Sequence, residues 1–479
     1  MTSYREMAVR SFGWLAAFQV ASAAISQVAM IVLATILAPT DFGLFGLAMI
    51  VIVVVSIPGD LGLTVELVRR PDFETLLPTA LRIRWLVAVG LTAAALAAAL
   101  LTAIVFPNSS LAGLIAILAG IFPAAALGFG PRVTLTKTLG FKVIAAVDTV
   151  GRISGPTVSI CFALLGAGYW SLAFGMLFSS WVTPVLLTVL RPVSYAGEFR
   201  GETAASLILL GKFVSISTLF GFLVSTGDNI ATVAIFGLFA LGLYTFAFSL
   251  TVTVPRNIAG MIETVVFPIF SRIVGDLERL KAGYLITLRC VSYVAFPVAF
   301  GFLVFSDGFV DVILGPKWEA MVAVMQILAF AGLFYSLSVP ASSALLALGL
   351  VKHVTRALAL ALLILGIGLA VAMALQVFKI VAVAAVAAAF TYLASLQTTL
   401  SRRLAVRYHE LLARVVHPAI AAGLVSWISL AILTVLRTDL MSLTISGITG
   451  LIAYFGAVEL VSRGEFIKSV RQMSSLLRK

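Results

Sequence analysis

The feature that most constrains this chain is a series of long apolar segments that recur from one end of the sequence to the other. A helix needs about 20 apolar residues to cross the ~30 Å hydrocarbon core of a bilayer. Of the 479 residues, 61% are hydrophobic and 11% are charged, whereas about 25% are charged in soluble domains. The sequence therefore predicts an all-α, polytopic membrane protein.

We expect fourteen membrane spans, each long enough for a helix that crosses the bilayer with some tilt. The connections on one side are very short, such as Pro39-Thr40-Asp41, and the longest of them runs from about Asp307 to Glu319. No connection on either side is large enough for a nucleotide-binding domain. The spans cover residues 10–38, 42–68, 83–106, 110–130, 145–166, 168–190, 209–237, 241–267, 285–306, 320–346, 357–377, 379–400, 415–436 and 440–461.

The Lys and Arg residues divide unevenly between the two sides of these spans. Of the 32, 28 fall on one side, Arg256 lies inside a span, and 3 (Lys317, Lys379 and Arg437) fall on the other side. Because cytoplasmic connections carry the excess of basic residues, we expect both termini to lie in the cytoplasm. The net charge of +12 then indicates topology rather than a nucleic-acid surface.

The sequence offers little to a metal or a cofactor. Its two cysteines, Cys161 and Cys290, both lie in apolar spans, so no disulfide framework is indicated. Its three histidines lie in basic connections without metal-ligand spacing. Because no phosphate-binding P-loop occurs, we do not expect ATP to drive the protein through its own chain.

An internal repeat is visible when the chain is shifted by 199 residues. The stretch Ala34–Phe45 then lies over Val233–Tyr244, and both read as an apolar span, a three-residue turn and a Gly-Leu-aromatic start of the next span. The alternative is a chance likeness of two apolar hairpins. Span 1 maps onto span 7, which predicts parallel repeats, and transporters built from such repeats bind substrate between their halves.

Asp228 and Asn229 fall inside the seventh predicted span. Their carboxylate and amide oxygens suit a hard cation such as Na⁺, or a proton in the case of the carboxylate. A structural pair that caps a kink beside Gly227, or that binds a neighbouring helix, is the alternative. We expect this pair to hold a coupling cation.

Arg256 and Glu263 lie in the eighth predicted span, seven residues or two helical turns apart, and therefore share a face. Arg256 follows Pro255, which kinks a helix, and its guanidinium can hold a phosphate in a two-pronged geometry. A buried ion pair of Arg256 with Glu263 or Asp228 is the alternative. Spans 7 and 8, joined by a turn at Leu238–Ala240, are expected to line a pathway.

Three further residues complete the candidate substrate site. Asp60 follows Pro58-Gly59 at a break in the second span, where an acid either caps the broken helix or binds a ligand. Lys212 and Arg10 lie one turn or less inside their spans, as does Arg289. Basic side chains near the ends of spans usually extend to the headgroups of the surrounding lipids. Those that face a cavity can instead attract the anionic headgroup of a substrate.

Several motifs resemble those of bacterial polysaccharide flippases, the polysaccharide-transport branch of the MOP superfamily (multidrug/oligosaccharidyl-lipid/polysaccharide exporters). The resemblance covers about residues 5–400, and its more specific parts are Gly-Pro-Lys-Trp at 315–318 and the Asp228-Asn229 pair. The motifs read LAPTDFGLFGLA, PGDLGL, GDNIATVAIFGLFALGLYTFAFSL, VVFPIFSRIVGD and ILGPKW.

The resemblance implies two six-helix lobes around a central cavity: an N-lobe (1–190), a cytoplasmic linker (191–208), a C-lobe (209–400) and a C-terminal helix pair with a tail (401–479). It implies flipping of undecaprenyl-diphosphate-linked oligosaccharide across the bacterial inner membrane, driven by a cation gradient, for exopolysaccharide, capsule or lipopolysaccharide synthesis. Membrane lipids, a glycan polymerase and glycosyltransferases are the implied partners. One departure is that the first lobe has no deep cation.

Three other functions stay open at this point. A multidrug/cation antiporter of the same superfamily also uses intramembrane acids, and its substrates are organic cations. A membrane enzyme such as a polysaccharide polymerase or ligase needs catalytic side chains on a sizeable outer loop, and 307–319 is small for that, so no enzymatic activity is expected. A scaffold does not need charged residues at the depth of Asp228 and Arg256.

Overall fold

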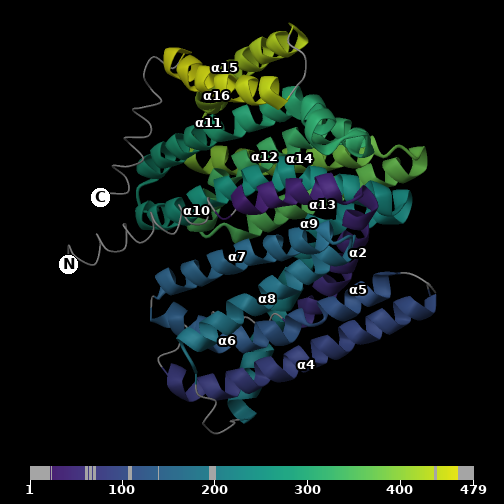
Figure 1. Cartoon of the computed structure of the whole chain (residues 1–479). Helices are drawn as coiled ribbons and strands as arrows, with labels where there is room; N and C mark the ends of the chain where they lie inside the picture. Colours follow the sequence, from purple (N-terminus) through teal and green to yellow (C-terminus); the bar gives the residue numbers. More distant parts are fainter. Residues whose placement is uncertain are drawn as a thin grey trace. The chain divides into compact units, whose positions relative to one another are not determined.

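A computed structural model describes residues 22, 24–59, 63, 67, 72–105, 110–138, 140–193, 201–435 and 440–461. In these ranges every regular element is helical, as Figure 1 shows. This follows from the apolar sequence, because a helix satisfies all of its own backbone hydrogen bonds where water is absent. The all-α prediction is confirmed.

The chain forms two compact units, Met1–Val233 (unit 1) and Ala234–Lys479 (unit 2). How these units relate to the predicted lobes and C-terminal helix pair stays a prediction. Unit 1 contains α2 (Pro39–Ser56), η1 (Ile57–Gly59), α4 (Phe73–Val105), α5 (Ser110–Leu118), α6 (Ile121–Lys137), α7 (Phe141–Leu164), α8 (Trp170–Leu190) and the first part of α9 (Gly201–Phe248).

Unit 2 begins within α9. Its further elements are the π-helix η2 (Ser249–Thr253), α10 (Val254–Ile273), α11 (Leu277–Phe309), the π-helix η3 (Val310–Leu314), the 3₁₀-helix η4 (Pro316–Met321), α12 (Val322–Ala347), α13 (Val351–Leu375), α14 (Lys379–Leu404), α15 (Tyr408–Val435) and α16 (Leu440–Val461).

The described parts of all fourteen predicted spans are mainly helical. In that part of the chain, 11 helices are long and apolar enough to cross a membrane. Predicted spans 7 and 8 lie on α9, η2 and α10, with a break at Gly237 between them. Span 5 falls on α7, and span 1 meets a shorter apolar helix at Ala24–Ile36. The chain is a multi-pass membrane protein.

Two of the breaks between helical segments of unit 2 lie at Gly237 and Gly315, both of which have positive φ. Gly237, at φ 82°, interrupts α9 one residue before the predicted turn. Gly315, at φ 81°, precedes η4, whose Trp318 is fully buried with its ring centroid 4.9 Å from that of Phe246. Because residues with a Cβ avoid this backbone region, the glycine of the Gly-Pro-Lys-Trp motif has a structural reason.

The connection from Asp307 to Glu319, predicted as a loop, is mostly helical. Helix α11 continues to Phe309, and η3 and η4 extend helical backbone to Met321 with a break at Gly315. The polar and turn-forming residues suggested a loop, but local helical turns satisfy the backbone groups there without one.

A continuous apolar core joins α10 to α16 in unit 2. One polar contact inside it is the hydroxyl of Tyr284 on α11, which donates to the Gln397 side-chain oxygen on α14 at 2.5 Å. Such contacts and close packing hold transmembrane helices together, since lipid supplies no hydrophobic driving force between them.

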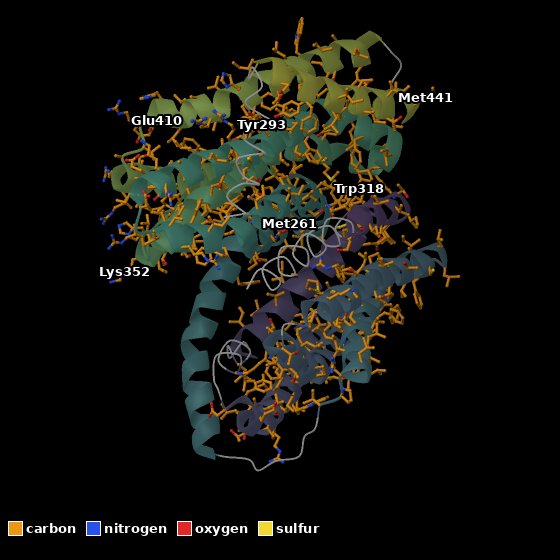
Figure 2. All side chains as sticks on the ribbon, turned by 90° about the vertical axis from the view of Figure 1, so that its left-hand side faces the viewer. Met261, Tyr293, Trp318, Lys352, Glu410 and Met441 are labelled. Carbon is orange, nitrogen blue, oxygen red and sulfur yellow. The ribbon has the colours of Figure 1, made fainter. Side chains whose placement is uncertain are left out.

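The ends of the unit 2 helices differ in charge. Figure 2 shows Lys352 and Glu410 at one end of this unit, and Trp318 and Met441 toward the other. At the charged end, the Lys281 ammonium on α11 lies 3.0 Å from the Glu410 carboxylate on α15 and donates to the Ala405 carbonyl at 3.2 Å. The structure thus gathers connections that the sequence assigns to one side of the membrane.

Candidate functional site

The first candidate site lies on α10 and begins with an irregular turn. Pro255 has no N–H, so the carbonyl of Thr251 four residues earlier receives no α-helical hydrogen bond from it, and the preceding residues form the π-helix η2. Helix α12 approaches this opened turn at Gly332, where a Cβ would overlap the Thr251 carbonyl. The proline and the glycine together set how α10 and α12 pack.

That packing places Arg256 beside an aromatic ring. Its guanidinium carbon lies 5.5 Å from the ring centroid of Tyr335, which stands one turn beyond Gly332 on α12. This is within the range of a cation–π interaction. Arg256 is exposed on unit 2, and Tyr335 is half-buried, so the stacked guanidinium keeps its hydrogen-bond donors accessible.

Glu263 has a different partner. Its Oε1 accepts a hydrogen bond of 3.0 Å from the hydroxyl of Ser343, a buried residue of α12. The ion pairs of the described residues do not include one between Arg256 and Glu263. The two charges therefore meet separate side chains of α12, about 10 Å apart along α10 at 1.5 Å per residue.

Tyr392 on α14 lies near both charged residues. Its ring centroid lies 6.4 Å from that of Tyr335, with 47° between the ring planes. Its hydroxyl lies within electrostatic reach of both Arg256 and Glu263. Unit 2 thus carries a cluster of Arg256, Glu263, Tyr335, Ser343 and Tyr392, which we call the α10–α12–α14 cluster; Met261 in Figure 2 marks its stretch of α10.

The second candidate pair belongs to unit 1. Asp228 is 4% exposed, and its Oδ1 accepts the backbone N–H of Asn229 at 2.8 Å. The hydroxyl of Thr232 donates to the Asp228 carbonyl at 2.7 Å. The side-chain oxygen of Asn229 is buried and has no hydrogen-bond partner among the described residues. A carboxylate and an unpaired amide oxygen therefore lie next to each other in the interior of the unit.

The structure does not place the remaining predicted site residues in either of these two clusters. Arg10 and Asp60 lie outside the described residues, as does the side chain of Lys212, whose backbone is helical in α9. Arg289, expected to reach toward headgroups, is 7% exposed and thus buried in unit 2. Its stem and head are covered by protein.

Tyr335, Ser343 and Tyr392 were missed from the sequence. A weak signal was present: Tyr335 and Ser343 belong to FYSLSVPASS, a hydroxyl-rich run around a proline in an otherwise apolar helix. Tyr392 carries no comparable signal, because it is one tyrosine in a helix rich in alanine and valine. Its role depends on the packing of α14 against α12.

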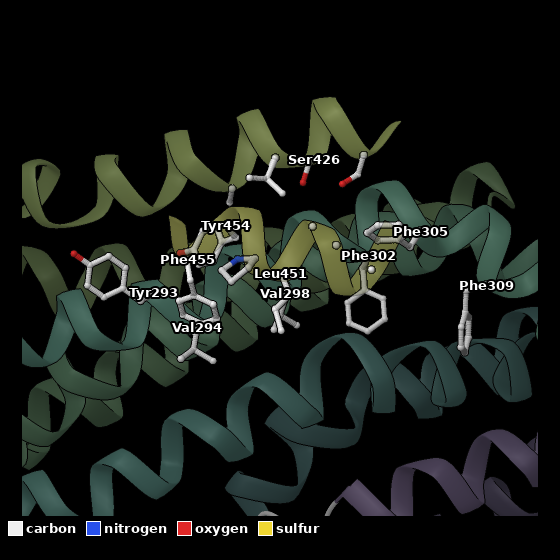
Figure 3. Close-up of a pocket in the computed structure, with 17 residues that line it drawn as sticks. Tyr293, Val294, Val298, Phe302, Phe305, Phe309, Ser426, Leu451, Tyr454 and Phe455 are labelled. Carbon is white, nitrogen blue, oxygen red and sulfur yellow. The ribbon is translucent and has the colours of Figure 1, made fainter. Parts of the chain in front are cut away.

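A separate cavity of ≈ 440 Å³ lies between α11, α15 and α16 within unit 2 (Figure 3). Its walls are almost wholly apolar and include Phe302 and Phe305 of α11 and Leu451 of α16. The hydroxyl of Tyr454, a lining residue that is 1% exposed, has no hydrogen-bond partner among the described residues. Such a space suits a hydrocarbon chain.

Solved structures with a similar fold exist. The lipid II flippase MurJ, in an inward closed conformation, has a TM-score of 0.75 at 13% identity, over 95% of this chain and 99% of that one. An inward-facing multidrug resistance MATE family transporter of the MOP superfamily has a TM-score of 0.64 at 13% identity, over 80% and 94%. The MOP-type fold expected from the resemblance is confirmed.

Sequence comparison is more specific. The lipopolysaccharide biosynthesis protein WzxC of Escherichia coli (strain K12) is 27% identical over 354 residues, 72% of this chain and 71% of the relative. Residues 32–323, which include α10 and the Gly-Pro-Lys-Trp motif, match the model of a protein family described as polysaccharide biosynthesis protein. The chain therefore belongs to the polysaccharide biosynthesis protein family.

Proposed function

We propose that this protein is a flippase that moves undecaprenyl-diphosphate-linked oligosaccharide from the cytoplasmic to the periplasmic leaflet by alternating access. The observation that carries the proposal is Arg256, a cation inside an apolar helix that is exposed and forms no ion pair among the described residues. A charge at such depth costs at least ~2.5–3.5 kcal/mol without a partner. An anionic substrate supplies that partner.

The chemistry of the substrate fits the cluster. A diphosphate loses its hydration when it leaves the aqueous surface, and a guanidinium offsets part of that loss through charge-assisted hydrogen bonds of about 1.5–3 kcal/mol each. The flat guanidinium can stay on the Tyr335 ring while its edge donates to phosphate oxygens. The family membership and the name of the Escherichia coli relative support a polysaccharide precursor as the cargo.

The polyprenyl chain needs an apolar path. The cavity between α11, α15 and α16 provides apolar walls for part of that chain (Figure 3). This gives the two C-terminal helices a task in the cycle that the sequence alone left open.

We further propose that Asp228 and Asn229 take up the coupling cation, Na⁺ or H⁺. The buried carboxylate and the unpaired amide oxygen of Asn229 are the kinds of oxygen ligand that a hard cation prefers. The protein would then need no other cofactor and would catalyse no covalent step. Both termini would lie in the cytoplasm, and the chain in the inner membrane beside the polymerase and glycosyltransferases of its pathway.

Substitution of Arg256 tests the proposal. Lysine keeps the charge but loses the fork, so Arg256→Lys should retain partial export of glycan, whereas Arg256→Ala should abolish it at normal protein level. If Arg256 only neutralises Glu263, the double variant Arg256→Met with Glu263→Leu should regain export, because no unpaired acid remains. Recovery of export in that double variant would remove Arg256 from the substrate site.

A further inference from the structure

The two tyrosines of the α10–α12–α14 cluster pack near its charged residues. Tyr335 comes from α12 and Tyr392 from α14, and both are half-buried, so part of each ring is accessible. Their ring centroids are 6.4 Å apart. Arg256 lies over the Tyr335 ring, and the Tyr392 hydroxyl senses the charges of both Arg256 and Glu263. The two rings therefore lie near a cation and an acid of the same cluster.

This part of the cluster has the chemistry of a sugar site. A pyranose ring presents C–H groups on its faces and hydroxyls on its edge, so aromatic faces bind the former and hydrogen-bonding groups the latter. An ionised carboxylate accepts about four hydrogen bonds. Ser343 fills one position on Glu263, and the remaining positions have no partner among the described residues. Glu263 can therefore accept hydroxyl groups of a ligand.

The spacing also fits a glycosyl diphosphate. Arg256 and Glu263 are separated by about 10 Å along the helix axis, which is room for a phosphate followed by a sugar ring. Aromatic rings beside an acid can also hold an organic cation, but the guanidinium already over Tyr335 repels a second positive charge at that place. The cluster thus favours an anion joined to a neutral ring.

We propose that Tyr335 and Tyr392 form an aromatic platform that binds the first sugar of the lipid-linked glycan, with Glu263 accepting hydrogen bonds from its hydroxyls. This inference rests on the proposed function, in which Arg256 holds the adjoining diphosphate. It makes Tyr392 and Glu263 residues that determine which first sugar is accepted. Tyr335 serves both the sugar and, through its ring, the position of Arg256.

Two probes separate this inference from the proposed function. Undecaprenyl diphosphate and the same lipid carrying one N-acetylglucosamine would be titrated against the full-length protein in nanodiscs. Tyr392→Met removes the ring but fills a similar volume with a flexible apolar chain, and it should weaken binding of the glycosylated probe about three- to tenfold. Binding of the sugar-free probe should stay unchanged. Tyr392→Phe, which keeps the ring, should bind both probes nearly as the unchanged protein does.

The controls decide which idea fails. Tyr408→Met alters an exposed tyrosine at the start of α15 and should change neither affinity. An equal loss for both probes in Tyr392→Met, or no loss for either, overturns the sugar platform and leaves the diphosphate site standing. If neither probe binds the unchanged protein, and tetraphenylphosphonium binds instead, the flippase proposal itself fails.

A second measurement needs no substitution. In saturation-transfer NMR on the unchanged protein, irradiation of aromatic protons should transfer saturation to the sugar ring protons of the glycosylated probe. Transfer confined to the polyprenyl protons would contradict the stacking of a sugar on these rings.

Discussion

Gly332 allows α12 to approach the turn before α10 closely, and replacing it with alanine tests this close approach directly. A Cβ at this position would overlap the Thr251 carbonyl oxygen and lie 3.0 Å and 3.2 Å from the Thr251 carbonyl carbon and the Val252 Cα. All three atoms belong to the backbone, so no side-chain rotation relieves the overlap. The change Gly332→Ala must push α12 away from the turn that Pro255 opens, and Tyr335 moves with it.

The magnitude follows from a matched control. Overpacking of this kind costs about 1–3 kcal/mol, while replacing a helical glycine by alanine gains roughly 0.5–1 kcal/mol. Gly366 of α13 is exposed, with no atom within 4 Å of an added Cβ, so Gly366→Ala should show the gain alone. Both variants share that gain. The difference between their free energies of unfolding should therefore equal the cost of the overlap, about 1–3 kcal/mol.

The assay is unfolding of the purified protein in mixed micelles of detergent and dodecyl sulfate, with glycan export measured in cells. The Gly332→Ala variant should unfold at a lower mole fraction of dodecyl sulfate and should export less glycan at normal protein level. The Gly366→Ala variant should export glycan normally. Equal unfolding free energies and normal export in both variants would refute the close approach of α12 to Thr251.

Three further substitutions address the rest of the mechanism. Asp228→Asn should remove the response of export to sodium and proton gradients while the protein still inserts, because the two side chains are nearly isosteric; an unchanged response counts against the coupling role, and loss of the protein indicates a structural one. Gly447→Phe places a ring in the cavity of unit 2, where nothing lies within 4 Å of an added Cβ, and should lower affinity for undecaprenyl diphosphate; the same change at Gly366 should not, and equal affinities refute a lipid chain in the cavity. A cysteine at Lys317 should react with a membrane-impermeant reagent in intact cells, and labelling that requires permeabilisation would reverse the topology.

Outside the stretch from Asp307 to Glu319, the sequence determined where the described chain is helical, and the reason is physical. In a bilayer an apolar segment of about 20 residues satisfies its backbone groups as a helix, so composition alone leads to the spans. The hairpin pattern of the internal repeat predicted a turn at Leu238–Ala240, and the break lies one residue earlier at Gly237, where a positive φ suits a residue without a Cβ. The shared face of Arg256 and Glu263 followed from helical periodicity alone.

Only the tertiary structure decided what those two charges meet. Both proposed partners of Arg256 in the sequence were acids, yet unit 2 places the ring of Tyr335, 79 positions further along, under its guanidinium. Ser343 and Tyr392 reach the same cluster from α12 and α14. These contacts depend on how closely the three helices approach. Between α10 and α12 that distance is set where a proline frees a carbonyl and a glycine admits it. Helical periodicity gives the face of each helix, but the neighbour across that face is fixed by packing between segments far apart in the chain.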